Sequence, residues 1–233
     1  MDIMNKKTQA ETGNDPSSHP IYHTMITAHA GAEDTAANTP ESLQTMLATG
    51  ADAVEVDVRK LDGTLYLSHD ASIKGKTYAT LQEALVLLKT VPHVMMNIDI
   101  KAAGLIMDIL GLARANSIAD RLLMTGDVGP DDYEVILNNE IPLWLNHYLL
   151  PIYEWANPVQ GAEKRGFLIV NIDKRMLTDH MLLRQADRFS VWTVNDEETL
   201  RRLLAAGVKN ITTRKPLLAI RLRSEIQQPL APK

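Results

Sequence analysis

Short apolar segments of strand length recur along the chain, and several are apolar at nearly every position instead of at alternate positions. Strands that are apolar on both faces are typical of parallel sheets that helices cover. The pattern predicts strands at residues 25–28, 53–58, 94–100, 121–125, 143–146, 168–171, 190–194 and 210–212.

Between these segments, apolar residues recur at helical spacing. Thr39 and Pro40 mark one helix start, because proline favours the first helical position. Thr80 and Glu83 have the spacing of a capping box, and Gly207 marks the end of a late helix. Weaker helical patterns cover residues 102–115, 130–138 and 177–186, and residues 151–165 are predicted to mix loop and helix.

Eight strands that alternate with about as many helices predict an α/β fold, a single closed (β/α)8 TIM barrel. An open doubly wound sheet is the rival architecture, but no G-x-G-x-x-G motif follows a strand here. The segment TLYLSHD, residues 64–70, alternates like a hairpin strand. It predicts a small hairpin insertion after the second barrel strand.

Composition narrows the possible partners and the compartment. The 233 residues carry a net charge of −5 and no cysteine, which argues against a nucleic-acid partner and excludes disulfides and thiolate chemistry. No apolar run approaches the roughly 20 residues of a membrane helix, so no membrane insertion is expected. We expect a cytoplasmic protein whose barrel spans residues 23–224, with a disordered N-terminal tail at 1–22 and a C-terminal tail at 225–233. The oligomeric state is left open.

Polar side chains stand at the predicted ends of the strands, where TIM barrels hold their chemistry. Glu55 and Asp57 lie two residues apart on one strand face, and Asp99 and Lys101 repeat this arrangement on the next barrel strand. Three converging carboxylates repel one another unless a cation lies between them. Their oxygen ligands, in a chain without cysteine, favour one divalent cation, Mg²⁺ or Ca²⁺, with Mn²⁺ as a further option.

Two histidines lie on candidate active-site segments. His29 ends the first strand and the hairpin segment carries His69, so the two imidazoles can act as base and acid in one proton-transfer cycle. Lys101 is predicted to stabilise a phosphate oxygen, or alternatively to form only an internal salt bridge with Asp99.

Three later residues are candidates for contacts with a substrate. Asn146 ends the fifth strand, and Trp192 and Tyr148 are predicted to form an apolar wall. The alternative for each is structural, because polar strand ends often cap loops and tryptophans in strands often belong to the core.

Taken in order, these pieces resemble the glycerophosphodiester phosphodiesterase family, within the phospholipase C-like phosphodiesterase barrels. The similarity runs from about Met25 to Pro216. The matching pieces are His29-Ala30-Gly31, Ala37-Asn38-Thr39, Glu55-Val56-Asp57, Asp62-Gly63, His69-Asp70, Asp99-Ile100-Lys101, Trp192–Asn195 and Gly207–Thr212.

The resemblance implies a metal-dependent phosphoric diester hydrolase that cleaves a small soluble phosphodiester into an alcohol and a phosphomonoester. It implies catalysis by His29 and His69, a cation held by Glu55, Asp57 and Asp99, and in many members a cyclic phosphate formed by a neighbouring hydroxyl of the substrate. Further substrate and phosphate contacts are then expected from Lys101, Asn38, Trp192, Asn146 and Arg214.

Four positions depart from the family pattern. Ala30 replaces a phosphate-binding arginine, Ala37 a glutamate, Asp99 a glutamate and Thr213 an aspartate. Arg214 or Lys215 are the candidates to replace the missing arginine, and the changes suggest a divergent subfamily acting on another alcohol or on an opine-like sugar phosphodiester. A lyase or transferase that stops at the cyclic phosphate, and a catalytically weak barrel that binds a phosphorylated ligand, are the alternatives.

Overall fold

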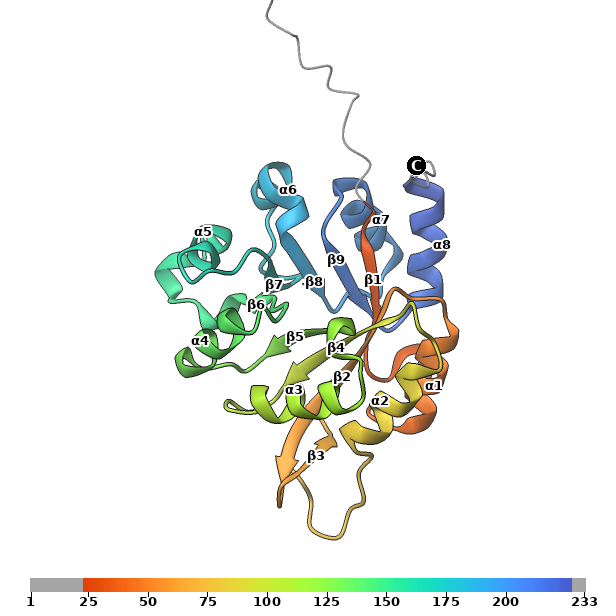
Figure 1. Ribbon diagram of the computed structural model, residues 1–233. Coiled ribbons are helices and arrows are strands. Elements are labelled where there is room, and N and C mark those ends of the chain that lie inside the picture. Colours follow the sequence, from red (N-terminus) through yellow and green to blue (C-terminus); the bar gives the residue numbers. More distant parts are fainter. Residues whose placement is uncertain (1–22, 228–233) are drawn as a thin grey trace, which may run out of the picture.

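Eight parallel strands form a barrel in the computed structural model, which describes residues 23–227 (Figure 1). The strand order is β5-β4-β2-β1-β9-β8-β7-β6, and the Met124–Leu143 bridge between the β5 and β6 regions closes the ring. The predicted TIM barrel is therefore confirmed. The barrel strands are β1 (Met25–Ala28), β2 (Ala53–Leu61), β4 (Met95–Ile100), β5 (Leu122–Gly126), β6 (Leu145–Asn146), β7 (Val170–Asp173), β8 (Phe189–Trp192) and β9 (Asn210–Thr213).

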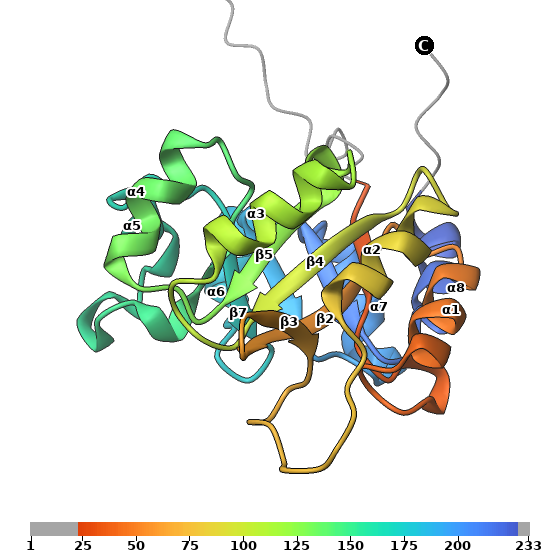
Figure 2. The same ribbon diagram turned by 60° about the horizontal axis from the view of Figure 1, so that its bottom comes forward.

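The predicted hairpin is also present. Strand β3 (Thr64–Leu67) pairs antiparallel with the last four residues of β2, and Asp62 and Gly63 both have positive φ in the two-residue turn. Such turns match the twist of the strands they join. The segment after β3 leaves the barrel as a long loop before α2, as Figure 2 shows at the bottom of the molecule.

The helices lie around the outside of the barrel (Figure 1). Thr39 caps the first helix by accepting a hydrogen bond from the Ser42 backbone, and Thr80 and Glu83 form the predicted capping box. The helices are α1 (Pro40–Ala48), α2 (Leu81–Lys89), α3 (Ile106–Ala115), α4 (Pro130–Asn138), α5 (Pro158–Glu163), α6 (Asp179–Gln185), α7 (Glu197–Ala206) and α8 (Pro216–Ile226). Short 3₁₀ turns are η1 (Ala32–Asp34), η2 (Ala119–Arg121), η3 (His147–Leu149), η4 (Ile152–Glu154) and η5 (Ala186–Arg188).

Alternation along the strands separates the apolar core from the polar barrel interior. On β2, Val54, Val56 and Val58 belong to the apolar core cluster, while Glu55 and Asp57 alternate with them. Because successive side chains on a strand point to opposite faces, the valines pack toward the helices and the carboxylates point into the barrel. Burying the apolar face thus places charged groups inside the barrel.

The limits of the described chain bear on two expectations. The predicted tail at residues 1–22 and most of the predicted C-terminal tail lie outside the described residues, and α8 continues to Ile226. Within residues 23–227, every helix is too short or too polar to cross a membrane.

Candidate active site

Three carboxylates meet where β2 pairs with the carboxyl end of β4. Asp57 and Asp99 face each other in the register of the two strands, and Glu55 lies two residues before Asp57. One oxygen from each of the three residues lies within 4.8 Å of the others. Glu55 is 2% exposed and Asp57 is 3% exposed, so these charges lie in a protein interior. We call Glu55, Asp57 and Asp99 the acidic cluster.

Lys101 offsets only part of this negative charge. Its Nζ lies 2.7 Å from Asp99 Oδ2 and 2.9 Å from Asp57 Oδ1. Burial alone would lower the pKa of Lys101, but the charges of Asp99 and Asp57 outweigh it and hold that pKa above its ordinary value. Burial raises the pKa of Glu55 well above its ordinary value, and the charges of Asp57 and Asp99 raise it further. The acidic cluster is therefore short of positive charge.

Gly126 makes room for the carboxylate of Asp99. A Cβ at position 126 would lie 2.5 Å from Asp99 Oδ1 and 2.2 Å from the Ile100 carbonyl oxygen, and Gly126 has a φ of 104°. Asp99 Oδ1 is buried and accepts no hydrogen bond from the residues that the structure describes. This oxygen is therefore available to a ligand, since a buried carboxylate oxygen without a partner is costly.

The side chain of His29 is oriented by a hydrogen bond to the backbone of the next residue. Its Nδ1 lies 2.9 Å from the Ala30 carbonyl oxygen, so Nδ1–H donates there and Nε2 keeps its lone pair. Arg214 Nε lies 3.5 Å from the same Nδ1, but a protonated Nδ1 cannot accept, and the shorter contact sets the tautomer. Burial lowers the pKa of His29, which makes the neutral form dominant at neutral pH. His29 thus presents a neutral, unprotonated Nε2.

His69 follows strand β3 and has the same tautomer. Its Nδ1 lies 2.9 Å from Asp70 Oδ1, which leaves Nε2 free. The backbone carbonyl of His69 accepts hydrogen bonds from Nε and Nη2 of Arg59, at 3.0 and 2.9 Å. The side chain itself is 68% exposed, so it can exchange protons with solvent and ligand.

One cavity of about 460 Å³ brings most of the predicted residues together. Its size is within the range of small-molecule sites. Asn38 is the exception: it lines an adjacent cavity of about 500 Å³, which also includes His69. The Asn38 amide donates to Asp57 Oδ2 at 2.7 Å, so Asn38 orients a cluster carboxylate. The predicted residues that line the 460 Å³ cavity are His29, Glu55, Asp57, His69, Asp99, Lys101, Asn146, Tyr148, Trp192 and Arg214.

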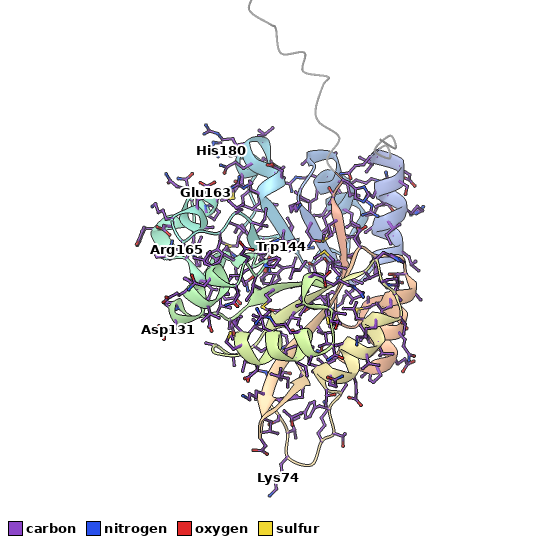
Figure 3. The ribbon with its side chains drawn as sticks, in the orientation of Figure 1. Lys74, Asp131, Trp144, Glu163, Arg165 and His180 are labelled. Atoms are coloured by element: carbon purple, nitrogen blue, oxygen red, sulfur yellow. The ribbon has the colours of Figure 1, made fainter. Side chains whose placement is uncertain are left out.

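Two other histidines lie outside this cavity. His147 is 6% exposed and packs edge-on against Trp155, with ring centroids 5.5 Å apart. His180 lies at the outer edge of the molecule on α6 (Figure 3). Neither residue lines the 460 Å³ cavity.

Several cavity residues were not predicted as site residues. Asp127 directly follows β5, so the strand-end pattern that identified Asp99 also marks it. Tyr148 was expected only as part of an apolar wall, yet its hydroxyl donates to Asp127 Oδ1 at 2.9 Å. Asn171 lies within β7, and Arg59 lies in the part of β2 that pairs with β3. Arg59 has no local sequence signal.

A closed barrel of alternating strands and helices, with an acidic cluster and two histidines around one cavity at the strand ends, defines a TIM-barrel protein with an enzyme-like site. Residues 29–102 match the Glycerophosphoryl diester phosphodiesterase family. The resemblance predicted from the sequence is therefore confirmed, over a segment that contains both histidines, the acidic cluster and Lys101. No curated protein sequence matches the chain significantly.

Solved structures extend the likeness to nearly the whole barrel. A glycerophosphodiester phosphodiesterase from Parabacteroides distasonis is 20% identical, with a TM-score of 0.72 over 89% of this chain and 100% of that one. One from Thermotoga maritima is 21% identical, with a TM-score of 0.64 over 87% and 99%. An Oleispira antarctica phosphodiesterase, solved with the product sn-glycerol-3-phosphate, is 17% identical, with a TM-score of 0.71 over 86% and 96%. At these identities the likeness establishes a shared fold.

Proposed function

We propose that this protein is a divalent-metal-dependent phosphodiesterase that cleaves small glycerophosphodiesters or sugar phosphodiesters into an alcohol and a phosphomonoester. The observation that carries the proposal is the acidic cluster beside a cavity that both His29 and His69 line. The family match over residues 29–102 supports the same reaction class.

The acidic cluster fits one divalent cation. Its three carboxylates exceed the single charge of Lys101 by two, and Asp99 Oδ1 is a buried oxygen without a described partner. Carboxylate oxygens suit Mg²⁺, Ca²⁺ or Mn²⁺, and Glu55, Asp57 and Asp99 would hold the ion. When bound, such a cation supplies a Lewis acid for the phosphoryl oxygens.

The two histidines divide the proton transfers. His29 is neutral with a free Nε2, so it takes the proton from the attacking hydroxyl, either water or a neighbouring hydroxyl of the substrate. The new bond to phosphorus forms as the bond to the leaving oxygen breaks. His69, when protonated, gives its Nε2 proton to that leaving oxygen. A neighbouring hydroxyl yields a cyclic phosphate, which water opens to the monoester.

The charges that line the cavity suit a phosphodiester once a divalent cation is present. Four carboxylates, from the acidic cluster and Asp127, face three cationic side chains, from Arg59, Lys101 and Arg214, and leave one net negative charge. A divalent cation changes this net charge to +1, which offsets the single negative charge of a phosphodiester. The cavity then attracts the substrate instead of repelling it.

The family pattern has a phosphate-binding arginine at the position of Ala30, and Arg214 is the best candidate to replace it. Arg214 lines the cavity, and its backbone N–H donates to Asn195 Oδ1 at 2.8 Å, which fixes the start of the loop after β9. Within residues 23–227, no carboxylate forms an ion pair with its guanidinium. Lys215 instead pairs with Asp34, with Nζ and Oδ2 3.1 Å apart. Arg214 therefore keeps its donors for a phosphate oxygen.

A phosphodiester screen with and without chelator tests the proposal. We expect turnover that EDTA abolishes and that Mg²⁺, Ca²⁺ or Mn²⁺ restores, together with a higher melting temperature when the restoring ion is added. Phosphorus NMR of the products separates full hydrolysis to a monoester from release of a cyclic phosphate. Full turnover after exhaustive chelation would contradict the assignment of the acidic cluster.

A further inference from the structure

A continuous chain of hydrogen-bonded side chains runs around the barrel from β1 to the end of β5, the strand that pairs with β4. Each member donates to the next, at distances between 2.6 and 3.0 Å, and the members come from six successive barrel strands or the segments that follow them. We call this chain the hydrogen-bonded arc. Its members, in donor order, are Thr27, Asn210, Ser190, Asn171, Asn146, Tyr148 and Asp127.

The arc fixes the orientation of its amides. Asn171 Oδ1 accepts from Ser190, and Asn171 Nδ2 donates to Asn146 Oδ1 at 2.7 Å. Asn146 Nδ2 then donates to the Tyr148 hydroxyl at 2.6 Å. A flipped Asn171 would place its oxygen against Asn146 Oδ1, and a flipped Asn146 would place its Nδ2 against Asn171 Nδ2, so either flip loses the hydrogen bond between the two amides. The groups at this end of the arc are preorganised.

The last four members of the arc line the 460 Å³ cavity and retain free hydrogen-bonding capacity. Each asparagine amide has a second N–H, and Asp127 has a second oxygen, that find no partner among the described residues. Trp192 lines the same cavity, and its Nε1 is buried without a described partner. Burial and the hydrogen bond to Asp127 raise the pKa of Tyr148, so its hydroxyl stays neutral. The wall thus offers N–H donors, one carboxylate acceptor and aromatic faces.

This combination matches a group that both donates and accepts hydrogen bonds. A hydroxyl can donate to Asp127 and accept from an amide N–H, whereas an ammonium group only donates and would leave the amides unmatched. A phosphate only accepts, and the charge of Asp127 repels it. An apolar alcohol would leave the second N–H groups of the buried Asn146 and Asn171 without partners, which costs binding energy.

We propose that Asn171, Asn146, Tyr148 and Asp127 bind the hydroxyl groups of a polyol or sugar moiety in the substrate, and that Asp127 determines this specificity. The proposal rests on the phosphodiesterase function proposed above and names its substrate class. It assigns to Asp127 the contact that distinguishes a substrate whose alcohol moiety carries further hydroxyl groups from one whose alcohol moiety carries none.

The test compares Asp127→Asn with the wild-type enzyme on three phosphodiesters. Glycerophosphoinositol carries many hydroxyls, bis(4-nitrophenyl) phosphate carries none, and 4-nitrophenylphosphocholine carries an ammonium group and no hydroxyl. We measure kcat/KM, and for a compound that binds without turnover, the inhibition constant against a cleaved substrate. We expect the variant to lose about 10-fold more on glycerophosphoinositol than on bis(4-nitrophenyl) phosphate, the size of one hydrogen bond to a charged group.

Two further variants complete the design. Tyr148→Phe removes the hydroxyl that joins Asn146 to Asp127, and we expect a smaller loss in the same direction. Asp131→Asn is the matched control, because Asp131 lies at the outer edge on α4 (Figure 3), and it should leave all three values unchanged. Equal losses of Asp127→Asn on all compounds, or a selective loss on the choline compound, would overturn the assignment. If the wild type cleaves no phosphodiester, the proposed function itself fails.

Discussion

The two walls of the cavity differ in how their polar groups are satisfied. The charged wall, at β1, β2 and β4, holds His29, Lys101 and the acidic cluster, where Asp57 and Asp99 pair with the one lysine and Glu55 does not. The amide wall, formed by the cavity end of the hydrogen-bonded arc, holds neutral amides and a hydroxyl that bond one another and end on Asp127. The carboxylates of the charged wall outnumber its one lysine, whereas the side chains of the amide wall are joined to one another by hydrogen bonds.

This difference suggests that the charged wall serves the reaction and that the amide wall serves substrate recognition. Negative charge that the fold leaves uncompensated is suited to a metal ion, which can in turn attract a reacting phosphate, because electrostatic interactions are strong where water is excluded. Neutral groups held in one orientation are suited to recognising an uncharged alcohol. Variants in the charged wall should therefore lower turnover on every phosphodiester, and variants in the amide wall should change the preference among them.

The largest expected effect follows the removal of either histidine. His29→Ala should lower kcat about 10²- to 10⁴-fold on all phosphodiesters, and His69→Ala should do so on glycerophosphoinositol, whose leaving alkoxide needs a proton, and much less on bis(4-nitrophenyl) phosphate, whose 4-nitrophenolate leaves without one. Steady-state kinetics on glycerophosphoinositol and bis(4-nitrophenyl) phosphate measure this, with His180→Ala on the outer surface as control. If both variants turned over normally, the reaction would use groups other than these two histidines.

Lys101→Ala should have the next largest effect. It removes the cation that lies 2.7 Å from Asp99 and is available to a phosphate oxygen, so kcat/KM should fall about 10²-fold on every substrate alike. Lys60→Ala is a matched control, because Lys60 pairs with Asp108 at 2.6 Å outside the cavity. A loss confined to hydroxylated substrates would assign Lys101 to recognition and erase the distinction between the walls.

The smallest expected effect is a shift of the acidic side of the pH–rate profile, the pH range in which kcat/KM falls as His29 becomes protonated. Burial lowers the pKa of His29, so its neutral, basic form persists below the ordinary histidine pKa of about 6.5. At saturating metal, kcat/KM should fall only as the pH drops below that value, and a pH–rate profile locates the midpoint. Arg214→Ala removes a nearby positive charge that also lowers this pKa, and should move the midpoint upward. A wild-type midpoint above 6.5 would remove His29 from the role of base.

Local pattern was sufficient for the barrel and for most of the charged wall. The predicted strand 25–28 and helix 130–138 agree with β1 and α4 residue for residue. Strand β7 was expected at 168–171 but spans Val170–Asp173, and Leu168 is 65% exposed. Apolar residues indicate burial, whereas hydrogen bonds to β6 and β8 set where this strand begins. The charged wall was predictable because Glu55, Asp57, Asp99 and Lys101 alternate on two strands and so share one face.

The amide wall was less predictable for a physical reason. Asn146, Asn171 and Asp127 belong to three different strands or strand ends, and no regular spacing in the sequence connects them. Their relation depends on barrel closure, which brings β5 beside β6, and on side-chain contacts between residues as far apart in sequence as Thr27 and Asn210. Such contacts have no signature in a single sequence.

The hairpin of β2 and β3 has one more consequence. His29 is anchored in a strand that pairs on both edges, with β2 and β9, whereas β3, which precedes His69, pairs only with β2 apart from a single bridge at Tyr66. The two rings therefore belong to units of unequal resistance to local opening. A local opening of the hairpin would therefore displace His69 while the closed ring of strands and His29 stay in place.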